Sequence, residues 1–92
     1  MLNYAIEQRL RLIDFLLAQY GSVSRNELMI FFGISSAQAT RDFKQYMEMA
    51  GDNALLNRKS RRYVRADTFE SIFNEKTKRD FFLTITGRDN LD

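Results

Sequence analysis

The residues of this chain best equipped for chemistry are arginines and lysines that crowd into one short segment. Residues 58–65 hold five cations and no acid: Arg58, Lys59, Arg61, Arg62 and Arg65. Like charges this close together repel one another unless a polyanion neutralises them. The segment therefore predicts a surface that binds phosphate groups.

The wider charge distribution agrees with that interpretation. Residues 36–65 contain seven basic and three acidic side chains, a net +4, which leaves −2 for the rest of a chain whose formal charge is +2. A cationic zone on a mildly acidic remainder is typical of proteins that face a nucleic-acid backbone.

The sequence contains few of the side chains that catalysis commonly uses. The chain contains no histidine and no cysteine, so it lacks the commonest general base, the commonest metal ligand and any thiol nucleophile. No pair of carboxylates stands at a useful spacing. We expect a protein that is not an enzyme and that uses no metal, cofactor or small-molecule ligand.

Length and hydropathy set the class of protein. The 92 residues, 45% hydrophobic and 28% charged, suit one soluble domain with a modest core. No apolar run approaches the roughly 18 residues of a membrane span, and residues 1–7 do not read as a signal peptide. We expect a cytoplasmic protein at the bacterial nucleoid, without a membrane partner.

Apolar periodicity predicts a first helix over residues 3–20, ended by Gly21. One stripe of that helix repeats at about 3.6 residues per turn: Ile6, Leu10, Ile13, Leu17 and Tyr20. A second strip, roughly a third to half a turn around, contains Leu12, Phe15 and Leu16. Two interpretations of this strip stay open, burial against the same chain or a subunit interface.

Two further helices follow with a very short connection. Ser24 and Glu27 have the spacing of a capping box, and Gly33 ends the helix they begin. Residues 35–38 repeat the capping pattern, which predicts a third helix to about Met49. Two capped helices separated by residues 33–35 indicate a helix-turn-helix, with Ile34 as the apolar plug beneath the turn.

A small β-hairpin and a C-terminal element complete the predicted fold. Residues 54–57 and 61–65 read as strands around a basic tip, and Asp67 can cap a fourth helix. We therefore expect a mainly α winged helix-turn-helix: a three-helix core plus a wing and an additional C-terminal helix or strand. Residues 1–66 would form the DNA-binding domain, and residues 67–92 a tail that can serve in dimerisation.

The third helix has one apolar and one polar side. Ala39, Phe43, Tyr46, Met47 and Ala50 fall on the side that must face the core. With the wing, the opposite side gives the candidate DNA-binding residues: Ser36, Ala37, Gln38, Thr40, Arg41, Lys44, Arg58, Lys59, Arg61 and Arg62.

These side chains suggest particular contacts, beside the plainer interpretation of a solvated helix face. Arg41 matches guanine O6 and N7, and Gln38 matches adenine N6 and N7, although capping offers Gln38 a structural role instead. Lys44 suits a phosphate. Asp42, at the edge of the core side, is expected to pair with an arginine rather than to contact DNA.

Several segments resemble a known family. Residues 33–43 (GISSAQATRDF) resemble the recognition segment of DeoR-type regulators. Together with residues 9–15 (RLRLIDF), 24–28 (SRNEL) and 61–64 (RRYV), they resemble the N-terminal domain of WYL-domain transcriptional repressors. The resemblance covers about residues 8–66. It implies a dimeric repressor on a palindromic operator, with Gln38, Thr40, Arg41 and the wing arginines at the DNA.

The family's pattern continues into a ligand-sensing domain, and these 92 residues do not contain one. The expectation is a stand-alone regulator, for example of a phage or mobile element, or a relative without its sensor. No nucleotide-sensing role is carried over.

The leading hypothesis is therefore a homodimeric, sequence-specific repressor or autoregulator of double-stranded DNA. The alternatives are a winged-helix adaptor or antagonist that docks a protein, and a DNA-processing accessory factor. The residues proposed for the dimer interface are apolar: Leu12, Phe15, Leu16, Phe69, Phe73, Phe81 and Phe82.

Overall fold

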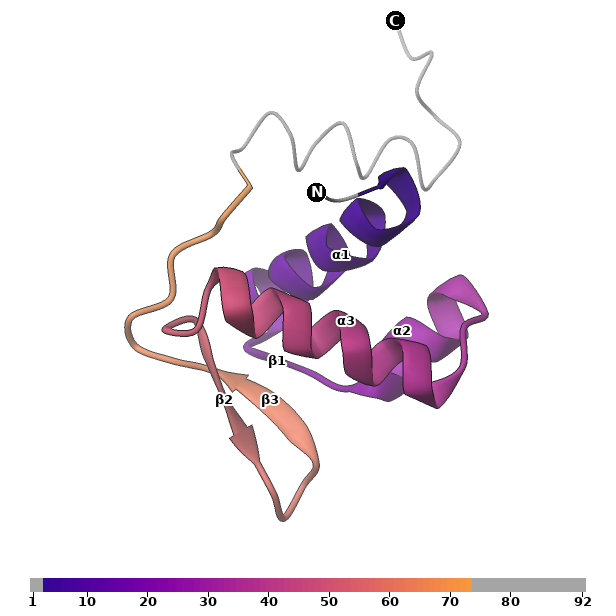
Figure 1. The fold of residues 1–92 in the computed structure, drawn as a ribbon. Helices are drawn as coiled ribbons and strands as arrows, with labels where there is room; N and C mark the ends of the chain where they lie inside the picture. The colour runs from indigo at the N-terminus through magenta and orange to yellow at the C-terminus, as the bar shows by residue number, and fades with distance from the viewer. Residues whose placement is uncertain (1–2, 74–92) are drawn as a thin grey trace, which may run out of the picture.

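The computed structural model describes residues 3–73, which form three helices and a three-stranded sheet (Figure 1). The helices lie together and the hairpin projects away from them. In chain order the elements are α1 (Tyr4–Tyr20), β1 (Ser22–Val23), α2 (Arg25–Phe32), α3 (Ser36–Met49), β2 (Ala54–Asn57) and β3 (Arg62–Arg65). The predicted three-helix core with a wing is confirmed.

Local caps end and begin the helices where the sequence predicts. Gly21 and Gly33 adopt φ values of 81° and 66°, the left-handed conformation that favours glycine. The capping box of Ser24 and Glu27 is complete. At the start of α3, the Ser35 hydroxyl accepts a hydrogen bond from the Gln38 N–H at 3.1 Å.

The core lies where the three helices meet the base of the sheet. Its largest buried apolar side chains come from all of these elements: Leu10, Ile13, Leu17, Val23, Leu28, Phe43 and Tyr46. The predicted core side of α3 is confirmed, because Ala39 is also buried and Met47 and Ala50 pack against the cluster.

Two sequence interpretations of α1 need adjustment. Tyr20 was expected to continue the apolar stripe, but it is 75% exposed because the helix ends beside it. Of the second strip, Leu12 is only 6% exposed and belongs to this chain's own core, against which Leu16 also packs.

None of the helices in residues 3–73 is long and apolar enough to cross a membrane.

The sheet is antiparallel in the order β1-β3-β2. Tyr63 pairs with Val23 on one side and Leu56 on the other, and its ring stacks on Phe43 of α3 with centroids 4.3 Å apart. Val64, the next residue, points to the opposite face and is 39% exposed. Tyr63 therefore packs against the core while Val64 faces away from it, and the stack attaches the hairpin to α3.

The predicted helix at Asp67 is absent from the described residues. The side-chain amide of Asn53 accepts a hydrogen bond from the Glu70 N–H and donates one to the Glu70 carbonyl, both at 2.8 Å. These backbone groups are therefore unavailable for helical bonds. Residues 66–73 instead return toward α1, and Phe69, Ile72 and Phe73 pack on the core. Phe81 and Phe82, which the sequence suggests for the dimer interface, lie outside the described residues.

A buried polar network holds this returning segment. The Tyr46 hydroxyl donates to Asp14 at 2.7 Å and accepts from Asn53 at 3.0 Å. The fully buried Asp14 also accepts from the Ser71 hydroxyl and the Ile72 N–H. Burial raises the pKa of Tyr46, so its hydroxyl keeps the proton that it donates.

We expect Tyr46→Phe to lower the free energy of unfolding by about 1–3 kcal/mol, because Asp14 and Asn53 each lose a buried partner. Chemical denaturation measures this change. Tyr20→Phe is the matched control, since that side chain is 75% exposed. Equal stability of the two variants would contradict a structural role for the network.

Candidate nucleic-acid interface

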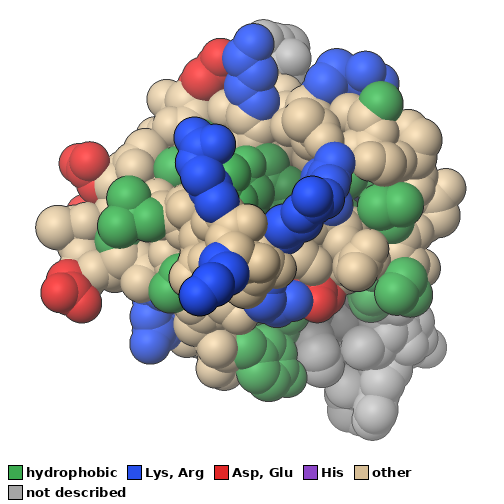
Figure 2. Space-filling model, turned by 90° about the horizontal axis from the view of Figure 1, so that it is seen from below, with side chains coloured by type: hydrophobic (Ala, Val, Ile, Leu, Met, Phe, Trp, Pro, Cys, Tyr) green, Lys and Arg blue, Asp and Glu red, His purple; other side chains and the backbone are tan. Residues whose placement is uncertain are grey.

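A hollow of about 370 Å³ lies between α3 and the wing. Thr40 of α3 lines it together with Arg58 and Arg61 of the wing. Figure 2 shows Lys and Arg side chains gathered around a depression with apolar side chains at its floor. Thr40, on one flank of the polar side of α3, and the basic wing therefore face the same space.

The exposed side of α3 contains most of the residues that the sequence predicts, although Gln38 is half-buried and the acidic Glu48 is exposed near its C-terminal end. Ser36, Ala37, Thr40, Arg41 and Lys44 are all exposed. The two residues nearest the N-terminal end are small, so the helix backbone can approach a partner closely. Cationic side chains follow further along the same helix.

The wing tip has a well-defined turn. The Asn57 side-chain oxygen accepts hydrogen bonds from the N–H groups of Lys59 and Ser60, and the Asn57 carbonyl accepts from Arg61 at 2.7 Å. Arg61 adopts φ of 60°, a conformation that is uncommon for a residue with a side chain. The turn leaves Arg58, Lys59 and Arg61 exposed at the tip.

The other two cations of the basic segment bind protein groups. Arg62 donates to the Ser22 hydroxyl at 3.0 Å and to the Glu27 carboxylate at 3.2 Å. Arg65 donates to the Ala18 carbonyl at 2.8 Å, at the C-terminal end of α1, where a cation suits the helix dipole. The structure thus places Arg58, Lys59 and Arg61 at the outer surface and turns Arg62 and Arg65 toward the helices.

Arg25 is a surface cation that the sequence interpretation missed. Its guanidinium donates to the hydroxyls of Ser36 and Thr40, each at 3.1 Å, and it lines the same hollow. The sequence gives no local signal for this contact, because Ser36 and Thr40 lie 11 and 15 residues further along the chain.

The predicted pairing of Asp42 with an arginine is confirmed. Asp42 is 1% exposed and accepts two hydrogen bonds from the Arg9 guanidinium, at 2.6 and 3.3 Å. Asp42 also accepts from the side-chain amide of Gln38 at 2.9 Å. The carbonyl of that amide in turn accepts from Arg41 at 3.0 Å.

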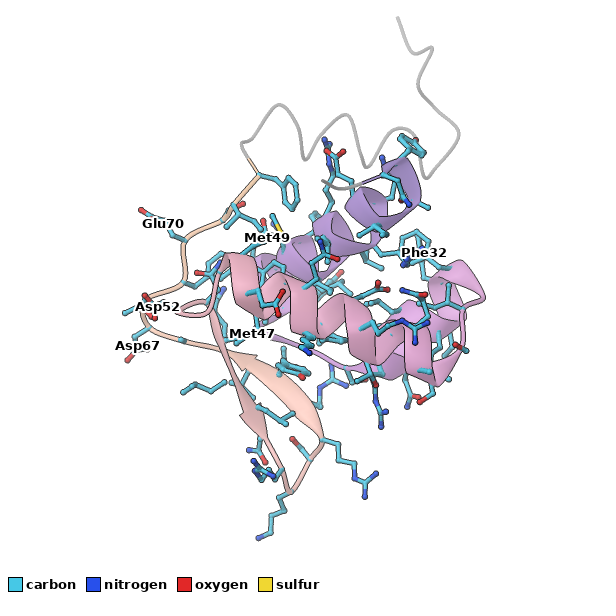
Figure 3. All side chains as sticks on the ribbon, in the orientation of Figure 1. Phe32, Met47, Met49, Asp52, Asp67 and Glu70 are labelled. Atoms are coloured by element: carbon cyan, nitrogen blue, oxygen red, sulfur yellow. The ribbon has the colours of Figure 1, made fainter. Side chains whose placement is uncertain are left out.

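Acidic side chains near this region lie away from the wing tip. Asp52, Asp67 and Glu70 are exposed on the loops beside the C-terminal end of α3 (Figure 3). Asp52 belongs to the basic stretch of the sequence, yet the fold places it with the acids that follow the wing. No group of three potential metal ligands occurs within residues 3–73.

Comparison with known proteins now identifies the family. Residues 5–87 match the model of the BrxR transcriptional regulator winged helix-turn-helix domain. The chain belongs to this family. Membership confirms the predicted winged helix-turn-helix regulator and agrees with the expectation of a regulator rather than an enzyme. The likeness to the DeoR type of regulator stays a resemblance.

The individual relatives that the chain resembles are named as DNA-binding transcriptional repressors. The chain is 38% identical over 65 residues to the DNA-binding transcriptional repressor CapW of Stenotrophomonas maltophilia, and 36% identical over 67 residues to CapW of Pseudomonas aeruginosa. CapW of Escherichia coli is 37% identical over 67 residues. The aligned parts cover 71–73% of this chain and 22% of each relative, so the chain spans about a fifth of their length.

The ion pair between Arg62 and Glu27 joins the wing to α2 and makes stability depend on pH. Burial opposes ionisation of Glu27, but the N–H and hydroxyl of Ser24 and the Arg62 guanidinium outweigh it and lower the pKa below its ordinary 4.5. A carboxyl with a lowered folded-state pKa stabilises the fold above 4.5, and this contribution is lost as pH falls through the folded-state pKa.

Glutamine can still accept the capping-box bonds, so Glu27→Gln should lower the free energy of unfolding at pH 7 by about 0.5–1 kcal/mol through loss of the charge that pairs with Arg62 and suits the first turn of α2. The difference should vanish below the folded-state pKa, where Glu27 of the unsubstituted protein is itself neutral. Urea unfolding of both proteins from pH 7 to pH 3 measures it. A difference that does not change with pH would contradict this role of the charged carboxylate.

Proposed function

We propose that the chain binds double-stranded DNA in a sequence-specific manner and acts as a transcriptional repressor or autoregulator at the nucleoid. Helix α3 enters the major groove while the wing tip follows the phosphate backbone or the minor groove. The observation that carries the proposal is the shared hollow, because Thr40 of α3 and Arg58 and Arg61 of the wing can then meet one duplex together. The names of the CapW relatives support it.

Each side chain has a role that follows from its chemistry and place. The small Ser36 and Ala37 let the start of α3 enter a groove about 12 Å wide. Arg41 reads guanine O6 and N7, the contact for which a guanidinium fork is suited. Lys44, Arg25 and the wing tip neutralise phosphates and set the register of the protein on the duplex.

A second copy of the chain is part of the proposal. One module of this size buries only about 600–1,000 Å² on DNA, which limits specific affinity unless two copies bind together. A two-fold dimer would place its recognition helices about 34 Å apart on a palindromic operator. Since Leu12 is buried in this chain, the described candidates for the interface are Phe15, Leu16, Phe69 and Phe73. Residues 1–66 would serve DNA binding and residues 67–92 dimerisation.

The first test concerns Arg41. A selection from randomised duplexes on the purified protein would define the preferred site, and fluorescence anisotropy would give affinities. We expect Arg41→Ala to weaken binding to that site by about 1–3 kcal/mol and to relax the preference at one base pair. Binding to random duplex should change much less. An equal loss on selected and random DNA would overturn the assignment of base reading to Arg41.

The second test concerns the wing. Replacing Arg58 and Arg61 together by Gln should weaken binding to all sequences alike and reduce the slope of log K against log salt by about 2 units. Arg65→Gln is the matched control, because Arg65 binds the end of α1; it should lower stability and leave the slope unchanged. A protein-docking adaptor would show little salt-dependent binding to random DNA even before substitution.

A further inference from the structure

A chain of polar contacts runs from the protein interior to the tip of Arg41. Arg9 donates two hydrogen bonds to Asp42, Asp42 accepts from the Gln38 amide at 2.9 Å, and the Gln38 carbonyl accepts from Arg41 at 3.0 Å. The contacts begin on α1 and end on the exposed face of α3. A buried ion pair is thereby connected to the side chain that we assign to base reading.

The buried end of this series of hydrogen bonds, the Arg9–Asp42 pair, is firmly held. Asp42 is 1% exposed and the Arg9 side chain 11%, and their bond is charge-assisted and uses two donors of one guanidinium. Gln38 is half-buried, and Arg41 is exposed. The fixed carboxylate of Asp42 therefore restrains Gln38, and Gln38 in turn restrains the exposed side chain of Arg41.

Chemistry fixes which way the Gln38 amide points. An ionised carboxylate only accepts hydrogen bonds, so Asp42 binds the amide nitrogen; a guanidinium only donates, so Arg41 binds the amide oxygen. A flipped amide would present the wrong group to both partners. To read adenine, the amide must offer an acceptor and a donor to the base together. While it holds Asp42 and Arg41, Gln38 has only one N–H and one lone pair left for such a contact.

We propose that Gln38 is a positioning residue, which orients Arg41 for guanine through the Arg9–Asp42 pair and reads no base itself. The proposal rests on the proposed function and names its specificity determinant. Arg41 keeps four of its five N–H donors after bonding Gln38, enough for the two-donor contact with guanine. Because its conformation is set before binding, less side-chain freedom is lost on the DNA.

The experiment compares Gln38→Leu with the unsubstituted protein on the selected duplex and on duplexes altered at the base pair that Arg41→Ala identifies. We expect Gln38→Leu to reduce the preference for guanine at that pair about five- to tenfold, as for the loss of one modest hydrogen bond. Affinity for random duplex and its salt slope should not change. Gln45→Leu is the matched control, since Gln45 lies one turn beyond Arg41 on the same helix.

Two further measurements separate positioning from base reading. In an Arg41→Ala background, Gln38→Leu should have no additional effect on specificity; additive losses would mean that Gln38 contacts the DNA itself. Loss of preference at a different base pair would overturn the proposal in the same way. In the free protein, ¹⁵N relaxation at Arg41 Nε should show faster motion in Gln38→Leu and no change in Gln45→Leu.

The outcomes distinguish this inference from the function on which it rests. If the protein shows no salt-dependent binding to any duplex, the proposed function fails. If it binds DNA with a guanine preference that Gln38→Leu leaves intact, only the positioning role fails. Thermal unfolding of each variant verifies that it is folded, and Gln38→Ala provides a second side chain without the amide.

Discussion

The stack of Tyr63 on Phe43 is the contact on which the arrangement of the interface depends. These rings lie 4.3 Å apart between β3 and α3, and they are nearly parallel. The stack fixes the side of the hairpin that faces α3, which is otherwise joined to that helix through the loop at residues 50–53. The pairing of β1 with β3 and the Arg62–Glu27 ion pair hold the other side of the wing. These contacts hold the basic tip so that its arginines share a hollow with Thr40 of α3.

Among residues 3–73, several cations bind protein groups while others remain at the surface. Arg9, Arg62 and Arg65 satisfy a buried carboxylate, a capping glutamate and the carbonyls at the end of α1. Arg41, Lys44 and the wing tip remain at the surface. The local density of positive charge in the sequence therefore overstates the charge offered to a polyanion. Of the cations that remain at the surface, Arg25, Arg58 and Arg61 line one hollow (Figure 2).

Two buried carboxylates organise the contacts between α1 and α3. Asp14, bound by Tyr46, Ser71 and the Ile72 N–H, holds the chain that leaves the wing against α1. Asp42, bound by Arg9 and Gln38, supports the face assigned to DNA. A buried carboxylate is costly unless every partner is present, so each one demands a single arrangement of the groups around it.

The sequence by itself determined the helices, their caps, the helix-turn-helix, the hairpin and the exposed face of α3. These features arise from neighbours in the chain: apolar periodicity, a serine before a glutamate, and a glycine where φ must be positive. Tertiary structure alone decided the two-residue strand β1, the contact of Arg65 with the end of α1, the position of Arg25 and the absence of a helix at Asp67. In each case the deciding partner is remote in the chain, as Asn53 is for Glu70, and no local pattern reveals such a partner.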